Sequence, residues 1–263
     1  IRRPPRSTQS RSSAASDVYK RQVIIPSRLA STRLPRKPLA DIAGKSLIQR
    51  VYERAIQSKA RKVYVATDEK EIFNHVRSFS DDVIMTSENH ISGTDRIQEA
   101  ANVINIQPNE TIINLQGDEP FVPIDLINNL SNVFNNSSCD VGTVVSKFSD
   151  ADEVDNPNSV KVALSNSNKA LYFSRSVIPD NFTKTDQIFY RHIGIYAYKK
   201  STLDRLVSLP PSSLELLEKL EQLRFIENGF TIEALIYNSL IPSGIDTQED
   251  LQSAVDFINN AHK

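Results

Sequence analysis

Short β-branched runs alternate with amphipathic stretches from Val23 to about residue 135, and this alternation limits the possible folds more than any other feature of the chain. Strands are predicted over 23–26, 62–67, 82–86 and 111–116. Helices are predicted over 46–57, 69–79 and 93–104 and from Pro123 onwards, because apolar residues recur there with a helical period. This βαβα order predicts an α/β fold with a mostly parallel sheet and helices on both faces.

The pattern changes after about residue 140. Strands without intervening helices are predicted over 140–148, 160–165, 170–174 and 192–199, which indicates antiparallel strands added at the edge of the sheet. Two helices interrupted at Pro210 and Pro211 follow, then a strand over 231–237. The C-terminal "GIDTQEDLQSAVDFINNA" reads as a loop leading into a helix, with Thr247 and Asp250 as a capping box.

The first 22 residues differ in composition from the rest of the chain. They are rich in Arg, Ser and Pro, show no apolar period, and lack the apolar stretch of a secretory signal. We expect a disordered, non-native leader over 1–22, resembling a translated adapter more than an organellar transit peptide. Residues 23–263 are then expected to form one domain, with a small lobe within about 140–230.

Charge and cysteine usage exclude several classes of protein. The first 22 residues hold six of the 31 Lys and Arg and one of the 32 Asp and Glu, which leaves a net charge of −6 on the remainder. A body this acidic argues against nucleic-acid binding. The single Cys139 excludes an internal disulfide and fits a reducing, cytoplasmic location. No apolar run approaches the ~18 residues that cross a bilayer, so no membrane association is expected.

Polar segments follow the predicted parallel strands. Ligands bind beyond the carboxyl ends of such strands, so residues 26–37, 67–68, 86–96 and 116–120 are expected along one rim of the sheet. The stretch "IINLQGDEP" leads from a strand directly to Asp118 and Glu119. On these residues alone, a solvent-exposed turn explains the two carboxylates better than a functional site does, because burying an unpaired carboxylate is costly.

A basic loop follows the first strand. "PSRLASTRLPRKPL" combines Arg28, Arg33, Arg36 and Lys37 with hydroxyl side chains such as Ser31. Cations and hydroxyls at the carboxyl end of a strand suit a polyphosphate, whereas a solvated basic loop is the alternative. The loop has neither the GxGxxG of dinucleotide-binding proteins nor a P-loop.

Nine blocks of the sequence resemble one enzyme family in both order and spacing. They are "IIPSRLASTRLPRKPLADIAGKSLI", "VYVATD", "SGTDRI", "NLQGDEP", "NPNSVKV", "ALYFSRSVIP", "RHIGIYAY", "LELLEKLEQLRFIENG" and "GIDTQEDL". From Val23 to the C-terminus the chain resembles the CMP-Kdo synthetases (3-deoxy-manno-octulosonate cytidylyltransferases). The resemblance implies a Rossmann-like, GT-A-related nucleotidyltransferase with a β-rich dimerisation lobe. It also implies a cytoplasmic homodimer that makes CMP-Kdo and pyrophosphate from CTP and Kdo for lipopolysaccharide biosynthesis.

The resemblance also implies roles for individual residues. Mg²⁺ is the expected cofactor, with Asp118 and Asp246 as its ligands and Lys37 as the third catalytic residue. The expected nucleotide-binding residues are Arg28, Ser31, Arg33, Lys37, Ser92, Thr94, Arg96 and Gln116. The expected sugar-binding residues are Arg175, His192, Tyr196, Glu221 and Gln222. His192 and Tyr196 lie four apart on a strand and are therefore expected on the same face.

Some features leave alternatives open. Arg36 stands where the family usually has glycine, so either its side chain points outward or the loop has another conformation. Glu119 is expected to be structural, and Asp246, taken alone, reads as a turn residue flanking a helix. The alternative functions are a cytidylyltransferase for another acidic sugar and a non-catalytic nucleotide- or sugar-binding protein.

Overall fold

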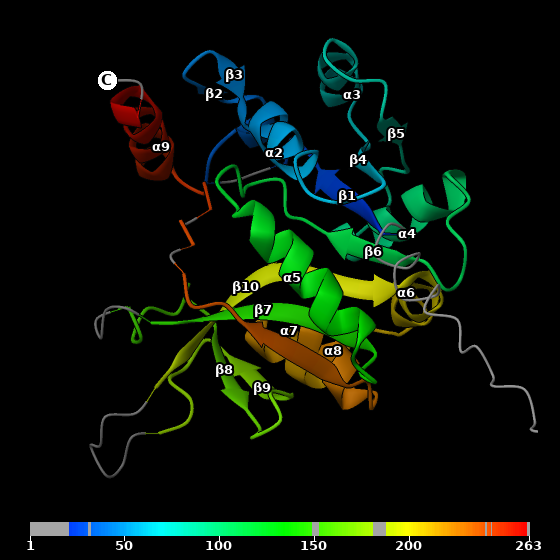
Figure 1. Ribbon diagram of the computed structural model, residues 1–263, viewed down its shortest axis with the longest axis vertical. Coiled ribbons are helices and arrows are strands. Elements are labelled where there is room, and N and C mark those ends of the chain that lie inside the picture. The colour runs from blue at the N-terminus through cyan, green and yellow to red at the C-terminus, as the bar shows by residue number, and fades with distance from the viewer. Residues whose placement is uncertain are drawn as a thin grey trace, which may run out of the picture.

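A mixed β-sheet forms the centre of the computed structural model, which describes residues 21–30, 33–148, 153–180, 188–239, 241–242 and 244–261. Its main path has the strand order β11-β7-β10-β6-β1-β4-β5 (Figure 1). The bounds along this path are Ile232–Ile236, Val141–Lys147, Tyr190–Lys199, Thr111–Asn114, Gln22–Ser27, Lys62–Thr67 and Val83–Met85. A separate hairpin joins β2 (Asp41–Ile42) to β3 (Lys45–Ser46).

Strand directions divide the sheet into two parts. The β1–β4, β1–β6 and β4–β5 pairs are parallel, as the alternating pattern predicted. β10 instead runs antiparallel to both β6 and β7, and it carries β8 (Lys161–Leu164) and β9 (Ala170–Ser174) beside the main path. The later strands therefore extend the sheet from the β6 side, and the prediction of antiparallel strands added at its edge is confirmed.

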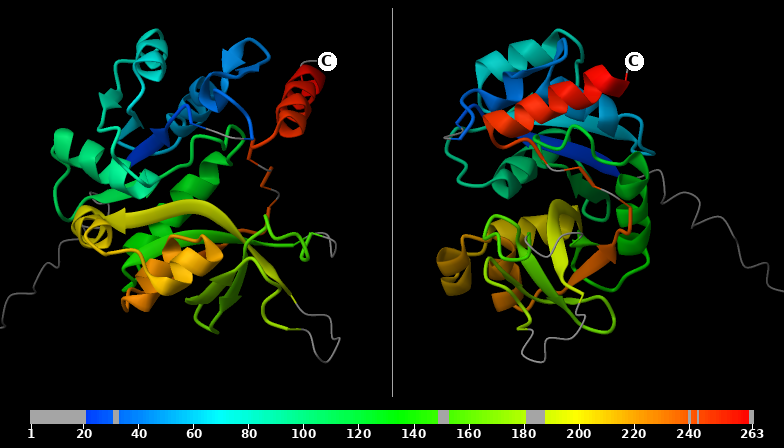
Figure 2. Two further views of the ribbon diagram at one scale, coloured as in Figure 1. Left: turned by 180° about the vertical axis from the view of Figure 1, so that it is seen from behind. Right: turned by 90° about the vertical axis from the view of Figure 1, so that its left-hand side faces the viewer.

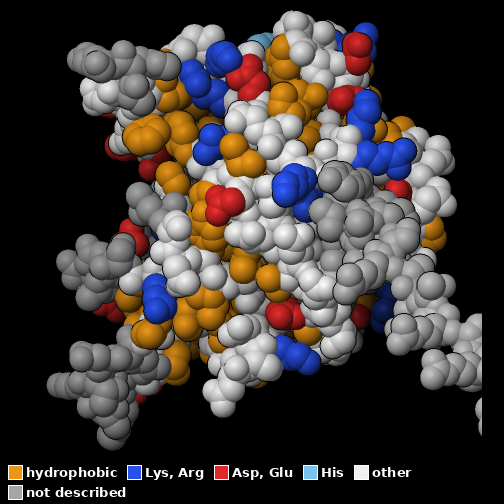
Figure 3. All heavy atoms as spheres, in the orientation of Figure 1, with side chains coloured by type: hydrophobic (Ala, Val, Ile, Leu, Met, Phe, Trp, Pro, Cys, Tyr) orange, Lys and Arg blue, Asp and Glu red, His pale blue; other side chains and the backbone are white. Residues whose placement is uncertain are grey.

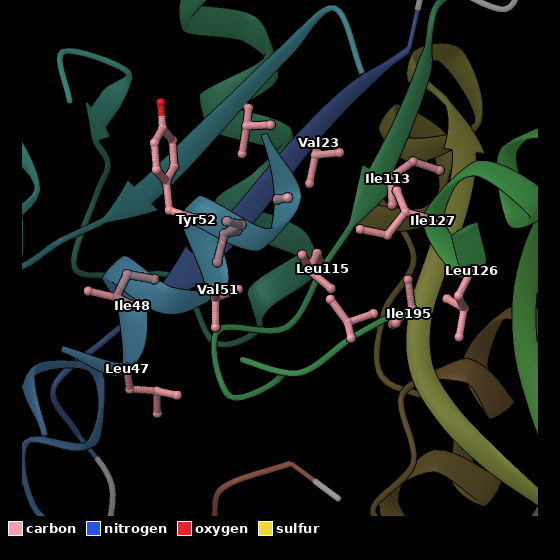
Figure 4. Close-up of a cluster of buried hydrophobic side chains, with 14 of the residues drawn as sticks. Val23, Leu47, Ile48, Val51, Tyr52, Ile113, Leu115, Leu126, Ile127 and Ile195 are labelled. Atoms are coloured by element: carbon pink, nitrogen blue, oxygen red, sulfur yellow. The ribbon is translucent and has the colours of Figure 1, made fainter. Parts of the chain in front are cut away.

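Helices cover both faces of the sheet because the side chains of β1 alternate between them. Val23 and Ile25 belong to one buried cluster and Ile24 to the other. The first cluster includes α2 (Leu47–Ala55) and α5 (Ile124–Asn135), with α3 (Lys70–Arg77) beside them. The second includes α4 (Gly93–Val103), α6 (Lys200–Val207) and α8 (Gln222–Glu227). Figure 4 shows Val51 of α2, Leu126 of α5 and Ile195 of β10 among the side chains of the first cluster.

The later strands and two short helices form the half of the molecule that lies away from β1. In both views of Figure 2, β8, β9, α7 (Ser213–Glu218) and α8 lie in the half away from β1. The chain then returns along β11 and ends in α9 (Gln248–Ala261), which lies over the half that contains β1. This return brings the segment after β11 back to the carboxyl ends of the parallel strands.

The first strand begins earlier than predicted. Gln22 is already part of β1 and pairs with Lys62 and Ile112. Arg21 is buried, and its carbonyl accepts a hydrogen bond from the backbone N–H of Arg61 at 2.9 Å. The expected boundary at residue 22 therefore falls inside the sheet, because register with both neighbours includes Gln22. The prediction of disorder over residues 1–20 lies outside the described residues.

Charged side chains of both signs are interspersed over the surface shown in Figure 3. No basic stripe separates from the acidic side chains on this face. Among the described helices, none combines the length and apolar composition needed to cross a membrane.

Candidate active site

A cleft of about 470 Å³ opens at the carboxyl ends of β1 and β6. This volume is within the usual range for small-molecule sites. Its lining comes from the loop after β1, the start of α4, the loop after β6 and the segment before α9. The polar and charged lining residues are Ser27, Arg28, Arg33, Lys37, His90, Ser92, Arg96, Gln116, Asp118 and Asp246. The predicted rim of polar segments is therefore confirmed for three of its four ranges, and Asp246 joins them from the far end of the chain.

Asp118 reaches the cleft because the chain turns tightly after β6. A Cβ atom at Gly117 would lie only 3.0 Å from the carbonyl oxygen of Pro26, so a side chain there would push this loop away from β1. Gly244 allows a second close approach, since a Cβ at that position would lie 3.3 Å from the carbonyl oxygen of Asp118. The backbone N–H of Ile245 then donates to this same carbonyl at 2.9 Å.

Asp246 is held in place by the start of α9. The Asp250 carboxylate accepts hydrogen bonds from the backbone N–H groups of Asp246 at 3.0 Å and Thr247 at 2.9 Å. The Thr247 hydroxyl accepts in return from the Asp250 N–H at 3.2 Å. The predicted capping box is therefore present, and it orients the residue that precedes it.

Lys37 joins the two carboxylates. Its Nζ donates to Asp118 Oδ2 at 2.8 Å and to Asp246 Oδ1 at 2.9 Å. The two oxygens can be no farther apart than the sum of these distances, so the predicted convergence of Asp118 and Asp246 is confirmed. Arg33 contacts the other oxygen of Asp246 at 3.0 Å. Two residues 128 positions apart thus share one cation.

This arrangement fits a divalent cation. Two carboxylate oxygens already converge on a positive charge, and Mg²⁺ prefers a few carboxylates completed by phosphate oxygens and water. Among the described residues, no group of three or more Asp, Glu, His and Cys could hold a metal by itself. The protein would therefore supply two ligands and leave the remaining positions to substrate and solvent.

The surroundings raise the pKa values of two residues at the site, Lys37 and Glu119. Burial disfavours the charged Lys37, but the Asp118 and Asp246 carboxylates outweigh it and raise the pKa of the ammonium. Burial, together with the charge of Asp118, raises the pKa of Glu119 to about 8. Glu119 therefore holds a proton at neutral pH and adds little negative charge beside Asp118, consistent with the structural role predicted for it.

The backbone conformation at Arg36 is one that glycine adopts more readily than other residues. Its backbone lies in the left-handed region, with φ 57° and ψ 27°, which is unfavourable for residues with a Cβ atom. Its side chain points outward and pairs with Glu71 of α3. The loop therefore keeps the conformation that glycine permits and tolerates an outward side chain, which was the first of the two alternatives.

The beginning of α4 forms the opposite wall of the cleft. The Ser92 hydroxyl caps the helix by accepting from the Asp95 N–H at 3.1 Å. Arg96 lines the cleft, but it is buried and donates to Asp68 at 2.7 Å and to Thr86 at 2.6 Å. Its guanidinium is therefore directed toward Asp68 and Thr86, at the ends of the neighbouring strands. Thr94 does not line the cleft, and its hydroxyl donates to Glu221 Oε2 at 2.6 Å.

Three of the five predicted sugar-binding residues, His192, Tyr196 and Glu221, lie close to one another near the start of α4. The rings of His192 and Tyr196 lie 5.4 Å apart, so the prediction that they share a face is confirmed. Burial, followed by the charge of Glu221, raises the pKa of Tyr196 well above its usual value. Gly194 on the same strand lies against Gln116, since a Cβ there would be 3.6 Å from its Cγ. These residues therefore adjoin the cleft without lining it.

His192 is neutral in this setting. Its ring packs edge-on against Phe173 at 5.0 Å, and burial lowers the pKa of the imidazole to about 3. The Thr143 hydroxyl lies 3.0 Å from the carbonyl oxygen of Ile195 and 3.1 Å from His192 Nε2, within hydrogen-bonding distance of both. The neutral imidazole offers one ring nitrogen as a donor and the other as an acceptor.

The remaining two sugar-binding candidates behave differently. Gln222 is buried, and its side-chain NH₂ has no hydrogen-bond partner among the described residues. Arg175 is not brought to the cleft. Its guanidinium donates to the backbone carbonyls of Glu218 at 2.8 Å and Pro157 at 3.0 Å. Ser31 lies outside the described residues.

His90 and Ile91 lie in the predicted rim but were not singled out as site residues by the sequence reasoning. His90 lines the cleft and pairs with Glu99 of α4, and the exposed Ile91 follows it. A single histidine in a polar loop carries no periodicity or motif that would have identified it. Only its placement beside the start of α4 brings it to the site.

Comparisons with known proteins show which family the chain resembles. The cytidylyltransferase family model matches residues 22–234. A 3-deoxy-manno-octulosonate cytidylyltransferase of Saccharophagus degradans is 47% identical over 241 residues, covering 87% of this chain and 94% of the relative. One from Polynucleobacter necessarius is 46% identical over 234 residues, covering 88% and 92%. A solved CMP:2-keto-3-deoxy-manno-octonic acid synthetase complexed with CTP has a TM-score of 0.86 and 36% identity, covering 92% of this chain and 99% of that one.

The backbone of Arg36 generates a stability prediction. The Arg36→Gly and Arg36→Ala variants both lose the pair with Glu71, but glycine alone relieves the left-handed conformation. We expect Arg36→Gly to be more stable than Arg36→Ala by about 0.5–1 kcal/mol. Urea unfolding of the two variants measures the difference. Equal stability of the two would show that this conformation costs nothing here.

His192 generates a pH prediction. Its folded-state pKa of about 3 lies below the usual 6.5, so the unfolded chain takes up a proton between these pH values that the folded chain does not. The associated stability is complete above pH 6.5 and is lost as pH falls toward 3. Relative to His192→Gln, the wild type should lose about 2 kcal/mol of unfolding free energy at pH 5. The difference should be constant between pH 7.5 and 8.5, and constancy down to pH 5 would contradict the prediction.

Proposed function

The chain belongs to the cytidylyltransferase family, within it to the 3-deoxy-manno-octulosonate cytidylyltransferases, and we propose that it transfers CMP from CTP to Kdo. The anomeric oxygen of Kdo attacks the α-phosphorus, the bond to the β-phosphate breaks, pyrophosphate leaves, and the hydroxyl proton passes to solvent. The observation that carries the proposal is the convergence of Asp118 and Asp246 on Lys37 in a basic cleft. Such a product is consumed in lipopolysaccharide biosynthesis.

The loop after β1 binds the triphosphate in this proposal. Arg28 and Arg33 line the cleft as exposed cations, and Lys37 lies deeper, with a side chain that is 16% exposed. Charged donors stabilise the negative charge that grows on the leaving pyrophosphate. The N-terminal turn of α4, capped by Ser92, faces the same space and favours anionic groups through its free N–H groups.

Mg²⁺ is proposed as the cofactor, held by Asp118 and Asp246. When bound, it would neutralise phosphate charge and acidify the attacking hydroxyl. The carboxylates are suited to this because Gly117 and Gly244 fix the loops that carry them.

Kdo is proposed to bind beside Gln116, against His192, Tyr196 and Gln222. The neutral imidazole of His192 offers one donor and one acceptor nitrogen. The NH₂ of Gln222, which has no partner among the described residues, donates hydrogen bonds. Both match the hydroxyl groups of a sugar. His192 is too weakly basic to deprotonate the sugar, given its pKa of about 3. It orients the substrate instead. Arg175 is not assigned to the Kdo carboxylate, because its guanidinium is held by the backbone carbonyls of Glu218 and Pro157 away from the cleft.

The alternatives from the sequence are separated by substrate tests. An acidic sugar other than Kdo would require the same cleft and metal, so varying the sugar at constant CTP distinguishes the two. A non-catalytic binding protein has no need for two carboxylates that converge on one cation. Cys139 is buried and unpaired, which supports a reducing, cytoplasmic location as part of the proposal.

The activity prediction concerns Asp118. Pyrophosphate release should require CTP, Kdo and Mg²⁺ together. Asp118→Asn should keep the fold, because it removes a charge from a carboxylate pair. It should nevertheless lower turnover, by an amount that corresponds to a loss of several kcal/mol of transition-state stabilisation, and additional CTP should not restore the rate. Glu119→Gln is the matched control and should retain most activity. Full turnover by Asp118→Asn would exclude the carboxylate from the reaction.

A homodimer through the lobe of β8, β9, α7 and α8 completes the proposal. β9 pairs with β8 alone among the strands described here, and Leu171 on β9 is 58% exposed. Leu216 and Leu217 on α7 are 54% and 79% exposed. We expect the wild type to sediment as a dimer and Leu217→Glu as a monomer, because a buried charge opposes association. Ile56→Glu, on the exposed end of α2, should remain dimeric. A monomeric wild type would contradict the proposal.

A further inference from the structure

Lys37 sits where a metal would bind. Its ammonium nitrogen lies 2.8 Å from Asp118 Oδ2 and 2.9 Å from Asp246 Oδ1, and its side chain is largely buried. Without a cation between them, two neighbouring carboxylates would repel each other. A divalent ion bound between these two oxygens would occupy the position that the ammonium now holds, so metal binding at this position requires the lysine side chain to leave.

The structure also shows how the lysine can leave. The backbone of Lys37 is anchored in the 3₁₀ turn Lys37–Leu39, where the Ala40 N–H donates to the Lys37 carbonyl at 3.1 Å. Movement is therefore confined to the flexible side chain. The same cleft contains Arg28 and Arg33, which prepare a place for an anionic group. A triphosphate bound there offers the ammonium a new partner close to its present one.

We propose that Lys37 serves as an internal stand-in for the metal, holding Asp118 and Asp246 together until nucleotide phosphate draws the ammonium away. Metal and nucleotide then bind cooperatively: the metal binds weakly to the free protein because it must displace Lys37, and the triphosphate lowers that cost. By linkage, the metal promotes triphosphate binding to the same degree. This inference rests on the proposed metal site.

Mn²⁺ binding without nucleotide tests the inference. Electron paramagnetic resonance measures free Mn²⁺ in titrations of the wild type, Lys37→Met and Lys62→Met. Lys62 pairs with Asp82 at 2.8 Å at the opposite end of β4 and is the matched control. We expect Lys37→Met to bind Mn²⁺ at least tenfold more tightly than the wild type, and Lys62→Met to match the wild type. Adding Asp118→Asn to Lys37→Met should abolish the gain, which shows that the ion is at this site.

The outcomes separate the inference from the proposed function. Equal Mn²⁺ affinity of the wild type and Lys37→Met, with loss in Asp118→Asn, would overturn the stand-in role and leave the metal site intact. Absence of Mn²⁺ binding in every variant, with or without CTP, would overturn both.

A second measurement uses the unaltered protein and does not depend on the variant's folding. Displacement by Mn²⁺ should expose the Lys37 amine, so its rate of acetylation by acetic anhydride, followed by peptide mass mapping, should rise at least threefold. The rate at Lys62 should not change. An unchanged rate at Lys37 in Mn²⁺-saturated protein would overturn the inference.

Discussion

The contact of the Lys37 ammonium with Asp118 and Asp246 brings together three distant parts of the chain: the loop after β1, the loop after β6 and the segment before α9. Two carboxylates this close repel each other, and the ammonium between them offsets that repulsion. Gly117 and Gly244 allow the loops to lie this close. A Cβ atom at these positions would be 3.0 Å from the Pro26 carbonyl oxygen and 3.3 Å from the Asp118 carbonyl oxygen, respectively. The cleft is therefore organised around one shared positive charge.

The two sides of the site provide different electrostatic environments. The proposed nucleotide side is open and charged, with Arg28, Arg33 and Lys37 lining the cleft. On the proposed sugar side, burial lowers the pKa of His192 to about 3 and raises the pKa of Glu221. Under the proposed function, the cations lie beside the nucleotide, and the neutral imidazole lies beside the sugar. Thr94 links the two sides through its hydrogen bond to Glu221.

Arg36 shows how a local departure can leave a site unchanged. The residue keeps a left-handed backbone, and its side chain turns away from the cleft toward Glu71. The next residue, Lys37, still points between the carboxylates. The left-handed backbone of Arg36 leads the chain into Lys37, and the Arg36 side chain does not line the cleft.

Periodicity in the sequence determined the strands, the helices and the layered α/β arrangement, because these depend on side chains three, four or two positions apart. Only the resemblance to a family predicted that Asp118 and Asp246 act together as metal ligands. Taken alone, Asp246 was interpreted as a turn residue. Tertiary structure decided where Arg96, Thr94 and Arg175 direct their polar groups. Their partners Asp68, Glu221 and the Glu218 carbonyl come from other elements. Such contacts depend on how elements pack against one another, and no local pattern records that geometry.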